Sequence, residues 1–362
     1  MIGGENRMSA RLNKGSRSVE KNDGLKRLKI PSDIHSFLPS VRNDTKYKKK
    51  KETPVENITD YVEEVENNGS GQRIVPPIKL GPGGKRRNEN YILQVMSDRN
   101  FGSGVWDIVM SDNKIIVCTT KAAILCKPNL LPKKELDKVS LPGCATFLKD
   151  GRIAIACRQF DKVHLYEPDG TWCSEWSCDD FQPTGMTSLS NGNFVLTDPG
   201  RKQVRIYGID GNKVKDIEAP PHHSFLWPLY VTAADDDSFY VTDCHAKLIH
   251  VFNSEGCWSH TLQPSAIQSS AISLPHCISS DSVGNMFIVD QSCGVIEVWR
   301  PSGIVLQSLL PTAQSEIIRP NIISIHKQTD RCAVGGKFGQ VKLFRLERID
   351  ADKQMFIDIT DS

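Results

Sequence analysis

The sequence lacks any long apolar run, and this absence argues against a membrane-spanning protein. None of its stretches approaches the roughly 20 consecutive apolar residues that a spanning helix needs. Residues 1–10 also lack the apolar core of a signal peptide. We therefore expect a protein without a membrane partner that resides in the cytoplasm, with a route to the nucleus through basic clusters near its N-terminus.

Cysteine is absent from the first 117 residues, and its 11 copies nowhere form a Cys-x-x-Cys pair. This pattern argues against zinc knuckles and dithiol redox motifs, which need closely spaced thiols. A glycine-rich phosphate loop and a nucleophile elbow are missing as well. We expect reduced and mostly buried cysteines, no metal and no cofactor.

The chain as a whole has little net charge, since its formal net charge is only +2. The charged residues are nevertheless unevenly distributed along it. Residues 1–90 hold 19 Lys and Arg against 12 Asp and Glu, a balance of +7. The remaining residues hold 26 against 31, a balance of −5. The sequence therefore joins a basic segment to a mildly acidic one.

Residues 1–90 are poor in apolar side chains, so they cannot bury enough surface to offset the entropy of ordering. We predict that this segment is disordered. Its two basic clusters suit nuclear import or contact with phosphates. The alternative is that they belong to an unbound tail and are simply solvated. The clusters are Lys48, Lys49, Lys50 and Lys51, and Lys85, Arg86 and Arg87.

A repeat begins near residue 91. Its clearest copy has Pro183 and Gly185, a turn at Asn191-Gly192, an apolar strand ending in Thr197-Asp198, a second apolar strand, and a turn at Asp210-Gly211. Corresponding positions recur at 104, 142, 183, 228, 275 and 320, at intervals of 38 to 47 residues. Strands and Gly, Asp or Asn turns at this interval are typical of β-propeller blades. The sequence therefore predicts an all-β fold with six blades.

The two ends of the repeat predict how the ring closes. The last copy stops after Phe344 and so lacks an outermost strand, while residues 91–97 resemble a strand without a blade. Pairing the two would complete the sixth blade and remove exposed strand edges. We predict a disordered basic segment at 1–90, a propeller at 91–346 with 91–97 as its closing strand, and an acidic C-terminal tail at 347–362.

The recurrent residues make the chain resemble the NHL-repeat family of six-bladed propellers over residues 91–345. The strand ending in Val-Thr-Asp and the following valine-rich strand carry this resemblance. Asp198, Asp243 and Asp290 end such strands, where we expect them to brace loops rather than act as catalytic acids. The copies that carry Thr119 or Thr120, Cys157 and Gly335 at this position depart from the pattern.

The resemblance is strongest to the C-terminal propellers of tripartite-motif proteins, several of which bind RNA through one face. Those proteins also carry RING and B-box zinc modules, which this sequence lacks, so it predicts no ubiquitin-ligase activity of its own. A related lyase propeller holds a metal through histidines, whereas here only His276 lies near a comparable position. We therefore predict a protein that is not an enzyme.

The candidate binding residues lie in loops that such propellers place on one face. Cations interleaved with aromatic rings suit single-stranded nucleic acid, because cations hold phosphates and rings stack on bases. The loops between second and third strands contribute Lys121, Arg158, Phe160, Lys162, Arg201, Lys202, His245, Lys247, Lys337 and Phe338. The loops that lead into first strands contribute Phe181, Phe225, Trp227 and Arg319.

Two functions remain open from the sequence. The first is RNA binding in post-transcriptional regulation, with single-stranded or hairpin RNA on the loop face. The second is a protein-interaction scaffold or a substrate adaptor in the ubiquitin–proteasome pathway, in which a protein or peptide occupies the same face. We expect a monomer in either case.

Overall fold

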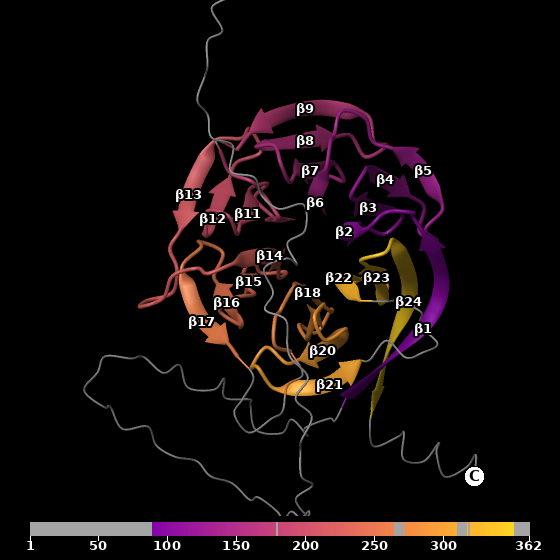
Figure 1. Ribbon diagram of the computed structural model, residues 1–362, viewed down its shortest axis with the longest axis vertical. Coiled ribbons are helices and arrows are strands. Elements are labelled where there is room, and N and C mark those ends of the chain that lie inside the picture. The colour runs from indigo at the N-terminus through magenta and orange to yellow at the C-terminus, as the bar shows by residue number, and fades with distance from the viewer. Residues whose placement is uncertain are drawn as a thin grey trace, which may run out of the picture. The chain divides into compact units, whose positions relative to one another are not determined.

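The computed structural model describes residues 89–178, 180–263, 270, 272–309, 317 and 319–350. These residues form six four-stranded antiparallel sheets arranged as blades around a central axis (Figure 1). The predicted all-β, six-bladed propeller is thereby confirmed. Residues 1–88, with both basic clusters, lie outside the described residues.

The strands follow the chain in order from the innermost to the outermost of each sheet, except that the outermost strand of the sixth sheet is β1. Blades 1 to 3 consist of β2 (Val105–Met110), β3 (Ile115–Thr119), β4 (Ala123–Cys126) and β5 (Pro132–Glu135); β6 (Pro142–Phe147), β7 (Ile153–Cys157), β8 (Lys162–Tyr166) and β9 (Trp172–Ser177); and β10 (Gly185–Ser188), β11 (Phe194–Asp198), β12 (Gln203–Tyr207) and β13 (Lys213–Ile217). Blades 4 to 6 consist of β14 (Pro228–Ala233), β15 (Phe239–Asp243), β16 (Leu248–Phe252) and β17 (Trp258–Leu262); β18 (Cys277–Ser280), β19 (Met286–Asp290), β20 (Val295–Trp299) and β21 (Val305–Leu309); and β22 (Pro320–His326), β23 (Arg331–Gly336), β24 (Gln340–Asp350) and β1 (Glu89–Asn100).

The core lies between adjacent blades rather than inside any one of them. Second strands such as β3 and β11 are buried along their whole length, because both faces of a middle strand pack against neighbouring blades. The innermost strands β2, β6, β10, β14, β18 and β22 contact one another in sequence around the axis, and β22 contacts β2 to complete the ring. Each blade is therefore held by its two neighbours.

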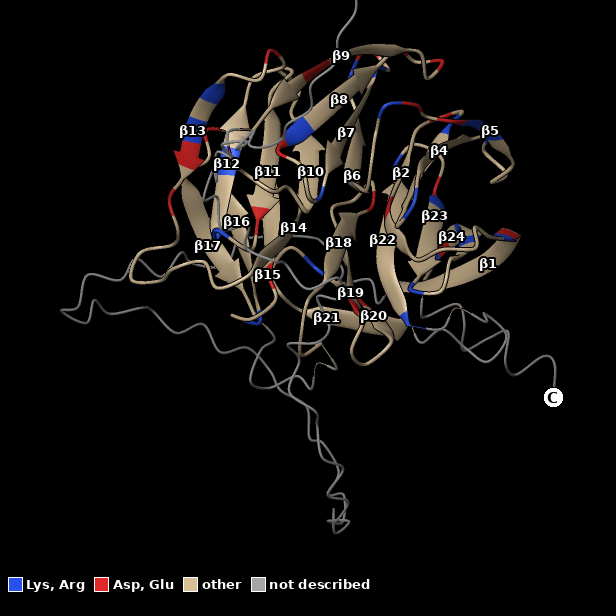
Figure 2. Ribbon diagram, turned by 45° about the horizontal axis from the view of Figure 1, so that its top comes forward, with Lys and Arg blue, Asp and Glu red and all other residues tan. Residues whose placement is uncertain are grey.

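Charged residues are almost excluded from the centre of the disk. Figure 2 shows them mainly on loops and outer strands, while inner strands such as β14 and β18 are tan. Across the six innermost strands, all within the described residues, Asp107 is the one Lys, Arg, Asp or Glu. It is consequently the sole carboxyl group that these strands place at the axis.

The ring closes through β1, which pairs antiparallel with β24 from Glu89 opposite Asp350 to Asn100 opposite Gln340. Both strands are longer than predicted, since β1 extends beyond residues 91–97 and β24 continues past Phe344. Residues 347–350 therefore belong to the sheet, which corrects the predicted start of the acidic tail. Residues 351–362 lie outside the described part of the chain.

Tyr91 fixes the closing strand to blade 5. Its hydroxyl donates a hydrogen bond to Asp281 Oδ2 at 2.7 Å and accepts one from Asn285 Nδ2 at 2.5 Å. Its backbone N–H donates to Gln307 Oε1 at 2.7 Å, and its carbonyl accepts from Gln307 Nε2 at 3.1 Å. The closing strand is thus fastened to a second blade as well as to β24.

The cysteines are all reduced, and most of them are buried as expected. Cys257 and Cys293 are the exposed exceptions, and Cys173 is partly buried. The buried thiols pack as small apolar groups in the strands.

Candidate functional site

Two sets of loops share one face of the disk. The register pairs the start of each first strand with the end of the second, as with Gly185 opposite Thr197 and Pro228 opposite Asp243. The loops that enter first strands therefore lie beside those joining second and third strands. We call this surface the loop face, and the surface formed by the remaining loops the opposite face.

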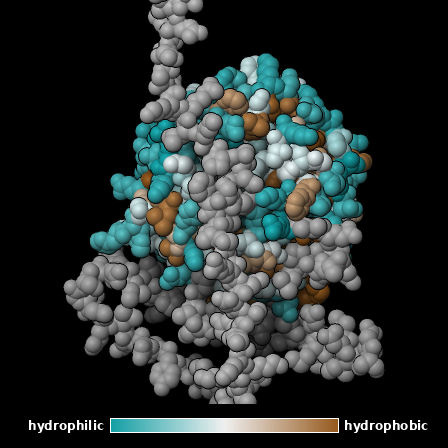
Figure 3. Space-filling model, viewed as in Figure 1, coloured by the Kyte–Doolittle hydropathy of each residue, from teal (hydrophilic) through white to brown (hydrophobic). Residues whose placement is uncertain are grey.

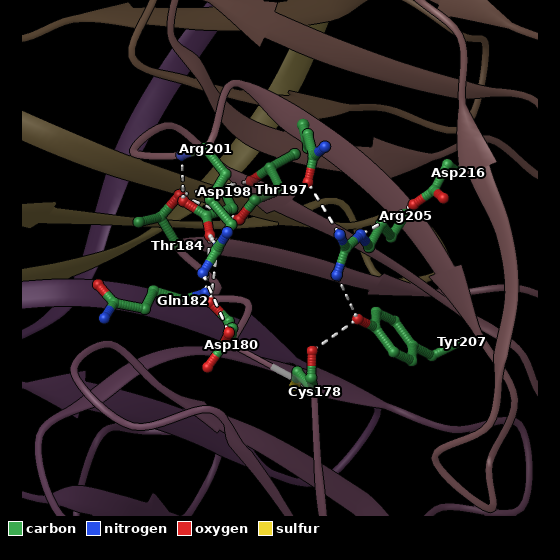
Figure 4. Close-up of polar contacts among 11 residues, drawn as sticks. Cys178, Asp180, Gln182, Thr184, Thr197, Asp198, Arg201, Arg205, Tyr207 and Asp216 are labelled. Carbon is green, nitrogen blue, oxygen red and sulfur yellow. Dashed lines mark hydrogen bonds and ion pairs between the residues drawn. The ribbon is translucent and has the colours of Figure 1, made fainter. Parts of the chain in front are cut away.

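Strand-end carboxylates hold the loop face in place. Asp198 Oδ2 accepts a hydrogen bond from the Gln182 N–H at 2.8 Å, and its Oδ1 accepts one from the Arg201 N–H at 3.0 Å (Figure 4). Asp243 and Asp290 accept backbone N–H groups from the corresponding loops of blades 4 and 5. In these three blades each carboxylate ties both loops of its own blade together, as the sequence predicts.

A hydroxyl replaces the carboxylate in blade 1. Thr119 Oγ1 accepts hydrogen bonds from the N–H groups of Lys121 and Ala122, at 3.2 and 3.0 Å, and donates one to the Ala122 carbonyl. The blade that departs from the repeat pattern therefore keeps a side-chain brace for its shorter loop.

The two faces differ in charge. Among the described loop residues, basic side chains outnumber acidic ones on the loop face, with Lys121, Lys138, Arg158, Arg201, Lys202, Lys247, Arg319 and Lys337 against Asp137, Asp161, Asp180 and Glu218. On the opposite face acids predominate, with Asp112, Asp150, Glu167, Asp169, Asp210, Asp235, Asp236, Asp237, Glu255, Asp281 and Asp330 against Lys114, Lys127, Lys149, Arg152, Arg300 and Lys327. The loops of the loop face are thus more basic than those of the opposite face, although Asp198, Asp243 and Asp290 at the adjoining strand ends add three carboxyl groups to the loop face.

Several predicted cations are already neutralised within the protein. Arg201 Nε donates to the Asp180 carbonyl at 2.7 Å, and its guanidinium lies 3.5 Å from the Asp180 carboxylate (Figure 4). Lys162 forms an ion pair with Glu175 on the neighbouring strand. By contrast, the described residues supply no side-chain partner for Lys121, Lys202, Lys247 or Arg319. These four side chains are exposed and available to an external anion.

Two aromatic predictions are wrong. Phe181 and Phe225 are 0% and 4% exposed and belong to cores between blades. Phe181 packs edge-on against Tyr207, and Phe225 packs against His250 and Phe252. Their loops turn inward to cover the ends of the blades, so neither ring is open to a ligand.

Other aromatic side chains do reach the loop face. Phe160 and Phe338 are 47% and 54% exposed. Trp227 is partly buried and stacks with the exposed His245, with ring centroids 4.9 Å apart. In the one view of Figure 3, the visible described surface is mostly hydrophilic, with small apolar patches. Exposed rings and exposed cations therefore both occur in the loops of this face.

A ring of six positions, one from each blade, surrounds the axis at the loop face. The ring comprises Trp106, Gly143, Thr184, Leu229, His276 and Asn321, each within one residue of the start of an innermost strand. Hydrogen bonds link its members to neighbouring blades: Thr184 Oγ1 donates to the Leu229 carbonyl at 2.9 Å, and Asn321 Nδ2 donates to the Val105 carbonyl at 2.5 Å. His276 Nδ1 lies 2.8 Å from the Asn321 carbonyl. The sequence does not predict a role for Trp106, because nothing in its local pattern distinguishes it from a core residue.

The layer beneath this ring contains a polar contact between opposite blades. Tyr230 on β14 donates its hydroxyl proton to Asp107 Oδ1 on β2 at 2.9 Å. Asp107 also accepts the N–H groups of Ala145 and Ile108, each at 2.8 Å. Burial nevertheless raises the pKa of this carboxyl from 3.8 to about 6. A buried carboxyl group with a raised pKa therefore lies near the axis and is hydrogen-bonded to the opposite blade.

Neither a metal centre nor a membrane span is present within the described residues. They contain no group of three or more His, Cys, Asp and Glu side chains arranged to hold a metal ion. They also contain no helix with the length and apolar character needed to cross a bilayer.

The fold and the arrangement of its loops define a six-bladed β-propeller, and no protein-family model matches the sequence. Similar solved structures include the virginiamycin B lyase of Staphylococcus aureus, with 15% identity and a TM-score of 0.53 over 70% of this chain and 99% of that one. A streptogramin B lyase has 16% identity and a TM-score of 0.52 over 73% and 89%. The WD40 β-propeller domain of Doa1 has 12% identity and a TM-score of 0.51 over 70% and 97%. At these identities the likeness extends to the fold alone.

These structures correct one prediction. The sequence analysis predicts that the protein is not an enzyme, but two of the similar propellers are lyases. The same fold therefore accommodates catalysis, and the absence of a familiar catalytic motif does not exclude it. The likeness assigns no reaction to this chain.

Proposed function

We propose that the chain is an NHL-type propeller, related to those of tripartite-motif proteins, that binds single-stranded or hairpin RNA through its loop face. The observation that carries this proposal is the unequal charge of the loops on the two faces, with unpartnered cations and exposed rings both present in the loops of one face. Phosphates would lie on the cations and unpaired bases on the rings. The basic clusters at Lys48–Lys51 and Lys85–Arg87 would add affinity that does not depend on sequence.

Backbone conformation supports a role for Lys202 and Lys247. Each directly precedes a third strand and has a left-handed backbone, with φ of 58° and 61°. Blades 5 and 6 have Gly294 and Gly339 at this position, with φ of 71° and 92°. A side chain in this conformation costs about 1 kcal/mol that glycine avoids. The turn therefore does not require a lysine at either position, and the ammonium groups are free to serve a ligand.

The test replaces both lysines with the residue that the turn prefers. The free energy of unfolding of a Lys202→Gly/Lys247→Gly variant should stay within about 1 kcal/mol of that of the parent. Glycine relieves backbone strain in the folded protein, but it also raises the conformational entropy of the unfolded chain, and the two effects offset each other. Binding to a random single-stranded RNA pool should weaken about tenfold at low salt. The slope of log affinity against log salt should fall by about 0.7 for each phosphate that the variant no longer neutralises.

The matched control removes two exposed cations from the opposite face, in a Lys127→Gln/Lys149→Gln variant. It changes the net charge equally, so it should leave RNA affinity close to that of the parent. Equal losses of affinity in both variants, or no loss in either, would contradict a binding site on the loop face. A parent protein without salt-sensitive RNA binding would refute the proposal altogether.

Exposed apolar side chains on the same face favour a second candidate function. Leu226 is 40% exposed and Phe338 is 54% exposed, and such side chains anchor protein partners. In this case the loop face would hold a peptide, as a scaffold or as a substrate adaptor in the ubiquitin–proteasome pathway. Binding of a partner that resists added salt but disappears in Phe338→Ala would favour this function over RNA binding.

A further inference from the structure

We propose that the axial end of the loop face contains a binding site for an oxyanion, a phosphate or a carboxylate group, in which the Arg158 guanidinium binds the ligand. The site is distinct from Lys202 and Lys247, and it does not require that the protein bind RNA. Three features support it. They are the position of Arg158, the absence of an acidic partner for its guanidinium among the described residues, and the polar groups of the surrounding ring.

Arg158 is held over the axial ring by two neighbours. Its guanidinium carbon lies 3.8 Å from the centroid of Trp106, a residue of blade 1, although Arg158 itself belongs to blade 2. The side chain passes directly over Gly143, where a Cβ atom would lie only 2.2 Å from Arg158 Cγ. Glycine at this ring position therefore leaves the space that the arginine occupies.

No acidic group compensates the Arg158 charge within the described residues. None of the ion pairs there includes it, whereas Arg201 and Arg205 contact Asp180 and Asp216. The carboxylate of Asp107 is committed to Tyr230 and to two backbone N–H groups. Burial lowers the pKa of Arg158 to about 10, which is the expected response of a desolvated cation without a carboxylate.

An unpaired, partly buried guanidinium is costly for a protein to keep unless something outside the fold offsets that cost. Stacking on Trp106 contributes only about 1 kcal/mol. The stacking holds the planar guanidinium in place. Its five N–H donors make no hydrogen bond to a described residue and so remain available to a ligand. These donors form the fork that matches the paired oxygens of a phosphate or a carboxylate.

The rest of the ring offers polar groups for the remainder of such a ligand. Asn321 is 3% exposed, and its Oδ1 has no hydrogen-bond partner within the described structure, although its Nδ2 is bound to Val105. An unsatisfied buried acceptor of this kind is uncommon in a folded protein. Beneath the ring, the Tyr230 hydroxyl of blade 4 contacts Asp107 of blade 1 across the axis.

The test measures binding of inorganic phosphate and of acetate to the full-length chain by calorimetry and by thermal unfolding. The parent protein should bind at least one of them and unfold at a higher temperature in its presence, because a ligand of the native state stabilises it. A response to phosphate alone assigns the site to phosphate groups, and a response to acetate alone assigns it to carboxylates. A response to neither overturns the proposal.

Two variants locate the binding at Arg158. Arg158→Met keeps an unbranched side chain for Trp106 but removes the charge, and it should lower anion affinity at least tenfold. Gly143→Ala keeps the charge but displaces it from Trp106, and it should weaken binding to a similar extent. Arg152→Met, on the opposite face, is the control and should bind as the parent does.

The outcomes separate this proposal from RNA binding and from misfolding. Circular dichroism shows which variants are folded, and either folded variant is sufficient for the test. Anion binding that persists in both Arg158→Met and Gly143→Ala would overturn the assignment to Arg158. Anion binding retained in Lys202→Gly/Lys247→Gly would show that the axial site is independent of the proposed RNA contacts.

Discussion

At the scale of single residues, Asp107 is the clearest instance of a polar group retained against the cost of burial. Its three hydrogen bonds favour the ionised form, but the loss of solvation outweighs them and raises its pKa to about 6. The hydroxyl of Tyr230 shares this environment, and burial also raises its pKa well above the ordinary value. The pair therefore makes the stability of the propeller depend on pH.

The dependence has a definite sign. The unfolded chain ionises Asp107 near pH 3.8, whereas the folded protein keeps the proton until about pH 6. Between these values the native state binds more protons, so the contribution of Asp107 to the free energy of unfolding falls as pH rises, by about 3 kcal/mol in total. An Asp107→Asn variant should lack this fall. Its unfolding free energy relative to the parent should rise between pH 4 and pH 7 in urea titrations.

Comparison with the parent at each pH is essential, because His250 acts in the opposite direction. Burial lowers its pKa from 6.5 to about 4, so its contribution to stability increases as pH rises through that range. Both proteins carry His250, and its effect cancels in their difference. A difference that stays constant with pH would contradict the raised pKa of Asp107.

At the scale of elements, the closing strand depends on Tyr91 as much as on its pairing with β24. Tyr91→Phe removes one partner each from Asp281 and Asn285, which are 3% and 6% exposed. Leaving buried polar groups unsatisfied costs about 1–3 kcal/mol, so urea unfolding should occur at lower concentration. Tyr240→Phe, in blade 4 and away from the closure, is the matched control. Equal effects of the two substitutions would deny Tyr91 a special role.

Much of this element structure could be predicted from the sequence. Most blades repeat a strand that ends in Thr or Asp, all have turns that contain glycine or aspartate, and both features are local. The burial of Phe181 and Phe225 could not be predicted, because it depends on Tyr207, His250 and Phe252, residues reached only after folding. The contact of Arg158 with Trp106 could not be predicted either, because it joins two blades and neither local sequence indicates it.

At the scale of the whole molecule, shared cores predict cooperative unfolding. The core between blades 2 and 3 contains residues of both, Leu196 among them, so neither blade has a core of its own. Leu196→Ala, at a position with 0% exposure, should lower the free energy of unfolding by about 2–5 kcal/mol. It should do so in a single transition, followed equally by tryptophan fluorescence and circular dichroism. An early transition limited to one probe would show that blades unfold separately, as units of an open repeat can.

The pairing of β1 with β24 also has a mechanical consequence. Glu89 and Asp350, where these strands leave the disk, lie opposite each other at one end of the antiparallel ladder. Tension applied between the two would therefore break the ladder one residue pair at a time, instead of loading all its hydrogen bonds together. At the third pair, Tyr91 with Arg348, separating the strands would also require breaking the hydrogen bonds between Tyr91 and blade 5. The force needed to open the ring is thus set largely by one tyrosine near its seam.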